Sequence, residues 1–156
     1  MSYRLREATL ADADVLVRHR LAMFSDMGEP FDRPALDASF REWLQTMMTA
    51  GTYRAWLVEG AGGEIAAGGG MSIIAWPPSP RNLGHTIAFA YNVYTEPAHR
   101  RRGLARMVMD AVHESCARDG IRTVALHASV DGQPLYTSMG YRSWPTPMMF
   151  LPIVRV

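Results

Sequence analysis

The stretch Pro97-Ala98-His99-Arg100-Arg101-Arg102-Gly103-Leu104-Ala105 decides the fold, because it joins a strand-like run to an amphipathic helical run. Four arginines, at positions 100, 101, 102 and 106, fall within seven residues, and no acidic residue lies among them. Gly103 stands where a turn would become a helix. Free N–H groups at a helix N-terminus, together with the helix dipole, attract anions. We therefore predict that this turn binds a phosphate group.

Hydrophobic periodicity outward from this turn predicts one α/β domain in the order β-α-α-β-β-β-α-β-α-β. Strands are predicted over residues 3–8, 53–59, 65–75, 86–95 and 121–128, with an edge or irregular strand over 141–156. Helices are predicted from Thr9 to the break at Gly28, over 37–49, from Leu104 to Gly120, and from Gly132 to Gly140. Pro145, Pro147 and Pro152 limit the last strand.

Composition narrows the class of protein. The formal net charge is +1, which does not favour binding to nucleic acid, and every basic residue is arginine, so lysine chemistry is excluded. A single cysteine, Cys116, excludes an intrachain disulfide. The chain lacks an apolar signal-peptide core and an apolar run long enough to span a bilayer, so we expect a cytoplasmic protein without a membrane partner. Neither a phosphate-loop motif nor a dinucleotide glycine motif is present.

Two motifs resemble the GNAT superfamily of N-acetyltransferases. The family pattern Arg/Gln-x-x-Gly-x-Gly/Ala after a strand is matched by Arg100, Gly103 and Ala105. A later stretch, residues 126–141, resembles the strand and helix that end in the family's Tyr-x-x-x-Gly-Phe/Tyr signature. The resemblance implies a single N-acetyltransferase domain over residues 1–156. It also implies a mixed central sheet of six to seven strands with about four helices.

The resemblance also implies a binding site for acetyl-coenzyme A, without a metal. The pyrophosphate would rest on the N–H groups of residues 101–105, with arginine side chains at the rim. The pantetheine arm would pair with the backbone of the preceding strand, which must diverge from its neighbour. Ser129 stands where many members carry an Asn that contacts this arm. The expected donor-binding residues are Val93, Tyr94, Thr95, Arg100, Arg101, Arg102, Gly103, Leu104, Ala105, Ser129 and Tyr136.

By the same resemblance, Tyr136 is the general acid that protonates the leaving sulfur; the other interpretation is a core aromatic residue. The general base stays open, and the candidates are Tyr91, Glu29, Asp26, His127 or a water relay. Tyr91 has the strand parity of Val93 and Thr95, so we expect it to face the transfer site. Asp26, Glu29, Asp32 and Asp37 form either a solvated loop or an acidic mouth that attracts cationic acceptors.

The predicted function is therefore direct acetyl transfer from acetyl-coenzyme A to a primary amine, favouring a small molecule such as a metabolite, amino acid or antibiotic-like amine. Two alternatives stay open: an acetyltransferase of protein N-termini or lysines, and a non-catalytic acyl-coenzyme A sensor. A homodimer is a further expectation. The sequence leaves the acceptor and the acyl-chain preference undetermined.

Overall fold

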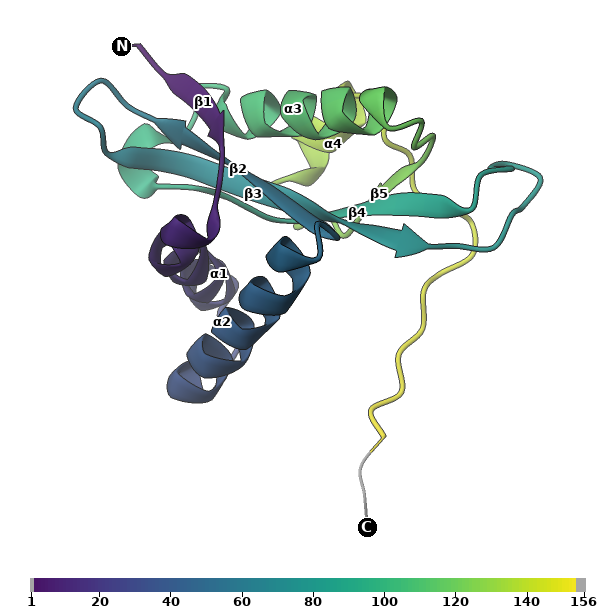
Figure 1. Cartoon of the computed structure of the whole chain (residues 1–156), viewed down its shortest axis with the longest axis horizontal. Coiled ribbons are helices and arrows are strands. Elements are labelled where there is room, and N and C mark those ends of the chain that lie inside the picture. Colours follow the sequence, from purple (N-terminus) through teal and green to yellow (C-terminus); the bar gives the residue numbers. More distant parts are fainter. Residues whose placement is uncertain (1, 154–156) are drawn as a thin grey trace.

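A mixed five-stranded sheet with helices on both faces forms the protein, in a computed structural model that describes residues 2–153. The strands lie in the order β1-β2-β3-β4-β5; the first four are antiparallel and β5 runs parallel to β4. In Figure 1, α1 and α2 lie against one face of the sheet, and α3 and α4 against the other. The strands are β1 (Arg4–Glu7), β2 (Tyr53–Glu59), β3 (Ile65–Ala75), β4 (Thr86–Thr95) and β5 (Val124–Leu126). The α-helices are α1 (Ala13–Asp26), α2 (Arg33–Thr49), α3 (Leu104–Arg118) and α4 (Gln133–Ser138), with 3-10 turns η1 (Leu10–Asp12) and η2 (Pro97–His99).

The predicted class and mixed sheet are confirmed, and β2, β3 and β4 have the predicted bounds. Helix α2 begins four residues earlier than predicted, because the Asp32 carboxylate accepts a hydrogen bond from the Ala35 N–H at 3.0 Å and Pro34 lies in the first turn. The prediction of a final strand over residues 141–156 is wrong for residues 141–153, which contain none, and residues 154–156 lie outside the described part of the chain. The three prolines of this segment remove the N–H donors that a strand ladder needs. The described part of the chain therefore has five strands and not six to seven.

The two faces of the sheet carry separate hydrophobic clusters. Successive side chains of β2 enter these clusters alternately. Tyr53, Ala55 and Leu57 pack against α1 and α2. Trp56 and Val58, at the alternate positions of the strand, pack with residues of α3. A strand buried on both faces is apolar at consecutive positions, and this is what the sequence of β2 shows.

Three consecutive glycines in β3 let the helices on both faces approach the backbone. A Cβ at Gly68 would lie 2.8 Å from a methyl of Leu57, and one at Gly69 would lie 2.9 Å from a methyl of Val108. A Cβ at Gly70 would lie 2.5 Å from the Tyr53 hydroxyl and 2.6 Å from the carbonyl oxygen of Arg54. At each position a neighbouring atom would have to move to admit a Cβ, and at Gly70 one of these atoms belongs to the backbone, so a side chain there is the most disruptive.

We predict that Gly70→Ala lowers the free energy of unfolding by about 2 kcal/mol, because the new methyl must displace a backbone carbonyl. The measurement is the urea midpoint followed by far-UV circular dichroism. Gly62→Ala is the matched control, since its Cβ would meet only the flexible end of Glu64. Equal midpoints for the two variants would contradict the packing described here.

Candidate active site

The edge of β4 toward β5 is unpaired over its second half. Strand β5 pairs with β4 only from Ala88 to Ala90. From Tyr91 to Thr95, β4 continues beside β3 alone among the described residues. The strand divergence expected from the sequence is therefore present, and it leaves main-chain N–H and C=O groups available to an extended ligand. Val93, Tyr94 and Thr95 lie on this edge.

A β-bulge at Asn92 reorients the side chains of β4 where this divergence begins. Gly68 pairs with Tyr94 and Gly70 with Tyr91, so β4 has one more residue than β3 between these pairs. Asn92 has φ 61°, a left-handed conformation that only a few residue types tolerate. Tyr91 consequently faces α1 and α2, whereas Val93 packs in the cluster beneath α3. The predicted common parity of Tyr91 and Val93 is wrong, because the bulge shifts the alternation.

The side chain of Asn92 is buried and holds a polar network on the α1/α2 face. Its amide donates to the Tyr53 hydroxyl at 3.0 Å, and its carbonyl oxygen accepts a hydrogen bond from Arg20. The Arg20 guanidinium lies 5.0 Å from the ring centres of both Phe24 and Phe40, and burial lowers its pKa. This network fixes the bulge, since each buried polar group would otherwise cost free energy.

The arginine-rich turn has the backbone of an anion site. Arg101 and Gly103 both adopt left-handed conformations, with φ 63° and 77°. The first hydrogen bond of α3 runs from the Met107 N–H to the Gly103 carbonyl at 3.1 Å, so the N–H groups of residues 104–106 precede the helical ladder. A turn of this kind directs successive N–H groups toward one point.

The arginine side chains of the turn differ in the residues that they contact. Arg100 donates to the Thr95 carbonyl at 3.1 Å and to the Asp26 carboxylate at 2.6 Å. Arg102 lies 3.3 Å from the Tyr3 hydroxyl. Arg101 is exposed and shows no side-chain partner within residues 2–153. Arg100 therefore anchors the turn to α1, and Arg101 is the arginine best placed to meet an anion.

Tyr136 of α4 lies on the α3 side of the sheet, in the same cluster as Val93. Its ring packs edge-on against Tyr141 at 5.7 Å, and no hydrogen bond of its hydroxyl is found in the described residues. Burial raises the pKa of Tyr136, which keeps the phenol protonated. The Ser129 hydroxyl accepts a hydrogen bond from the Gly132 N–H at 3.1 Å, so it shapes the entry to α4.

The candidates for the general base have different surroundings in the structure. Asp26 is paired with Arg100, and Glu29 is exposed in the loop between α1 and α2. The His127 ring lies against Phe89, at 5.3 Å between centres. Burial raises the pKa of Tyr91, whose hydroxyl shares a short hydrogen bond with Ser72. Within the described residues, no hydrogen bond or ring contact joins any of these candidates to Tyr136, whose ring contact is with Tyr141.

The predicted acidic mouth is largely neutralised by the protein itself. Asp26 pairs with Arg100, and Asp32 caps α2. Asp37 lies 2.6 Å from Arg41. Only Glu29 of the four lacks a partner among the described residues, so this segment has the character of a solvated, internally paired loop.

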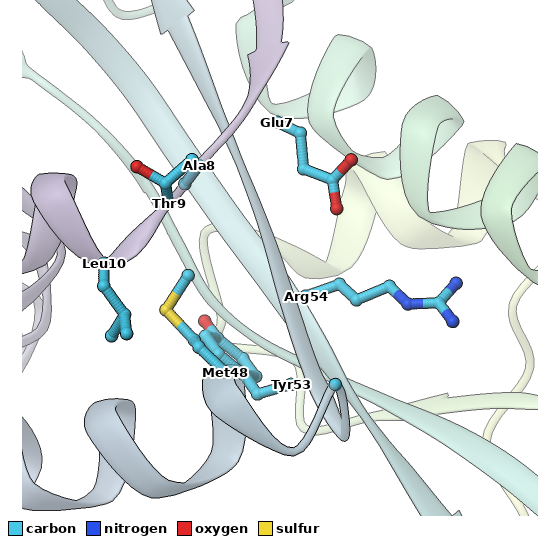
Figure 2. A pocket seen from close by; sticks show the side chains of 8 residues that line it. Glu7, Ala8, Thr9, Leu10, Met48, Tyr53 and Arg54 are labelled. Carbon is cyan, nitrogen blue, oxygen red and sulfur yellow. The ribbon is translucent and has the colours of Figure 1, made fainter.

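Two cavities lie on the sheet. One, of about 360 Å³, is bounded by α2, β3 and Tyr91 of β4. Its lining residues are Trp43, Met47, Thr52, Ser72, Ile73, Ile74, Ala75 and Tyr91. The other, of about 330 Å³, lies between the end of β1 and the start of β2, away from the β4 edge; Figure 2 shows Met48 and Tyr53 on one side of the strand and Arg54 pointing the opposite way.

Sequence reasoning missed Asn92, Ser72, Trp43 and Arg20 as site residues. Asn92 carried a usable signal, because asparagine is unfavourable inside a strand and marks a bulge or turn. The others carried none, since their roles depend on which residues the fold brings against the bulge. In residues 2–153 no group of three or more His, Cys, Asp or Glu side chains is placed to hold a metal, and no helix there is long and apolar enough to cross a membrane.

The diverging parallel strand and the N–H turn before α3 are two features that the resemblance to the GNAT superfamily implies. Comparison with known proteins agrees, because the family described as acetyltransferase (GNAT) domain matches residues 51–143, more than half of the chain. A GCN5-related N-acetyltransferase from Ralstonia eutropha JMP134 is 36% identical, with a TM-score of 0.86, over 97% of this chain and 99% of that one. The chain belongs to the GNAT family of acetyltransferases, which confirms the family predicted from its sequence.

More distant structures share the fold. A predicted acetyltransferase with acetyl-CoA from Clostridium acetobutylicum is 24% identical, with a TM-score of 0.88 over 96% of both chains. An aminoglycoside acetyltransferase from an uncultured soil sample is 17% identical, with a TM-score of 0.68 over 99% of this chain and 100% of that one. A search of functionally curated proteins finds no match.

His19 of α1 is buried beside Glu96, the residue that follows β4. The His19 Nε2 lies 3.1 Å from a carboxylate oxygen of Glu96, and its Nδ1 is buried without a partner in the described residues. Burial lowers the pKa of His19 from 6.5 to about 4, although the Glu96 carboxylate opposes this. The unfolded chain therefore binds a proton between these pH values that the folded chain excludes.

We predict that His19 contributes stability above pH 6.5 that is lost as the pH falls toward 4, by about 3 kcal/mol. Denaturant unfolding at a series of pH values measures this loss. His19→Gln removes the titration and should flatten the profile in this window, whereas the exposed His85→Gln should keep the wild-type profile. An unchanged slope in His19→Gln would contradict the assignment.

Proposed function

We propose that this protein, acting as one domain over residues 1–156, transfers the acetyl group of acetyl-CoA to a primary amine of a small molecule in the cytoplasm. The observation that carries the proposal is that the unpaired edge of β4 leads directly into the N–H turn before α3. The unpaired edge of β4 ends at Thr95, and the N–H cradle of α3 begins a few residues later. One extended, pyrophosphate-bearing donor therefore fits both features.

Each part of this surface has a role toward the donor. The N–H groups of residues 101–105, with the side chain of Arg101, hold the pyrophosphate. Arg100 supports them from behind through its contacts with Thr95 and Asp26. The main chain of Val93, Tyr94 and Thr95 pairs with the pantetheine arm as a neighbouring strand would. A family member with acetyl-CoA in its structure supports this choice of donor.

Bound acetyl-CoA supplies the acetyl group as a thioester. Tyr136 acts as the general acid: its hydroxyl gives a proton to the departing sulfur as the sulfur–carbon bond breaks. The amine nitrogen forms the new bond to carbon and releases one proton to water, and water returns a proton to Tyr136. An N–H of the β4 edge stabilises negative charge on the carbonyl oxygen.

The size of the cavity at Tyr91 supports a small-molecule acceptor. About 360 Å³ is at the lower end of the range for small-ligand pockets. A protein acceptor would require a long groove, whereas this cavity is bounded by eight residues.

We predict that Tyr136→Phe lowers kcat about 100-fold and changes the KM for acetyl-CoA little, because the ring is kept and only the proton donor is lost. Release of coenzyme A thiol across a panel of primary amines is the measurement. Tyr141→Phe is the matched control, since this phenol bonds to His113 at 2.6 Å and has no role in transfer. An undiminished kcat in Tyr136→Phe would exclude the acid role. Tight acetyl-CoA binding without turnover of any amine would favour the non-catalytic sensor.

We also propose a homodimer, supported by the apolar segment after α4. Its exposed large side chains are Trp144, Met148, Met149, Phe150, Leu151 and Ile153. In Figure 1 this segment leaves the body of the domain as an extended chain. A run of exposed apolar residues of this kind is typical of a surface that another chain covers.

We predict that the wild-type protein sediments as a dimer and that Phe150→Asp combined with Leu151→Asp shifts it to a monomer, because the charges oppose burial. Analytical ultracentrifugation checks both states. Leu83→Asp, at an exposed leucine in the β3–β4 loop, should stay dimeric. A monomeric wild-type protein would refute the dimer without affecting the proposed reaction.

A further inference from the structure

We propose that the acceptor is a primary amine carried on an uncharged aromatic body, which occupies the cavity bounded by Trp43, Ile74 and Tyr91. This inference rests on the proposed function and names the class of its second substrate. The cavity is the place on the α1/α2 face where a side chain of the diverging strand, Tyr91, meets open space.

The chemistry of the lining favours an apolar ligand. None of the described residues that line the cavity is charged. Six of the eight are apolar or aromatic, namely Trp43, Met47, Ile73, Ile74, Ala75 and Tyr91, and the other two, Thr52 and Ser72, carry hydroxyl groups. Trp43 and Tyr91 lie 6.2 Å apart at 58°, and Trp43 also stacks on Phe40 while Tyr91 stacks on Tyr53. Both rings line the cavity, so an aromatic group bound there would contact the parts of these rings that face it. A multiply charged amine would lose its hydration there without gaining an ionic partner.

The geometry of β3 and β4 places the polar end of this cavity at the transfer site. Ser72 and Tyr91 share a hydrogen bond, and they are the hydroxyl groups at the β4 end of the cavity. Tyr91 follows Ala90, the last residue of β4 that pairs with β5. An amine bonded to these hydroxyls would therefore lie at the start of the unpaired edge, where the donor's acetyl group is expected.

The surrounding acidic residues do not supply a site for a cationic body. Asp26, Asp32 and Asp37 are held by Arg100, the N-terminus of α2 and Arg41. These three residues, and Glu29, which has no partner in residues 2–153, all lie outside the cavity lining. The cavity consequently selects by shape and apolar contact, and the charge of the acceptor is confined to the amine that reacts.

The experiment compares coenzyme A release with 2-phenylethylamine, spermidine and the aminoglycoside kanamycin. We expect kcat/KM for 2-phenylethylamine to exceed that for either polycation at least tenfold. Ile74→Asp should lower kcat/KM for 2-phenylethylamine about tenfold or more and leave the KM for acetyl-CoA unchanged, because Ile74 lines the cavity and belongs to none of the buried clusters. Leu83→Asp is the matched control and should behave as wild type.

Binding without turnover gives a second readout. Calorimetric titration of 2-phenylethylamine into Tyr136→Phe, with acetyl-CoA present, should give a measurable affinity that Ile74→Asp abolishes. Equal or better use of spermidine or kanamycin would overturn this inference and leave the acetyltransferase proposal intact. Failure of every amine to release coenzyme A would instead overturn the proposed function, and with it this assignment of the cavity.

Discussion

The bulge at Asn92 is the constraint on which the rest of the site depends. A left-handed asparagine in the middle of a strand is unfavourable, and here the amide is held by Arg20 and Tyr53. The extra residue turns Tyr91 toward α1 and α2 while Val93 packs under α3. It lies where β5 stops pairing with β4, so one local distortion coincides with both the free edge and the change of face.

This arrangement divides the work of the site between the two faces of the sheet. Tyr136 and the N–H cradle belong to the α3 and α4 side, and the apolar cavity belongs to the α2 side. Arg100 spans the two, since it joins the turn before α3 to Asp26 at the end of α1. In the proposed function, the donor and the acceptor therefore approach from separate faces of the sheet and meet at the diverging edge of β4.

Local signals predicted the fold well, because periodicity, prolines and glycines act within a few residues. The bounds of β2, β3 and β4 follow from such signals, as does the anion-type turn at Gly103. The face of the sheet on which Tyr91 lies could not be predicted. Its assignment from the alternation of side chains assumes a regular strand, and a single inserted residue reverses that alternation. The ion pair of Arg100 with Asp26 could not be predicted either, because the two residues are distant in sequence and only folding brings them together.

The glycine run of β3 has a consequence for how this sequence can change. An ordinary strand has two faces that accept substitutions independently, so tolerance alternates along it. At Gly68, Gly69 and Gly70 the neighbours of both faces already occupy the space of a side chain. At these three positions, therefore, substitutions are not tolerated at every second residue as in an ordinary strand. Changes that reshape the cavity on the α2 face must come from α2 and from residues 72–75 of β3, which carry side chains.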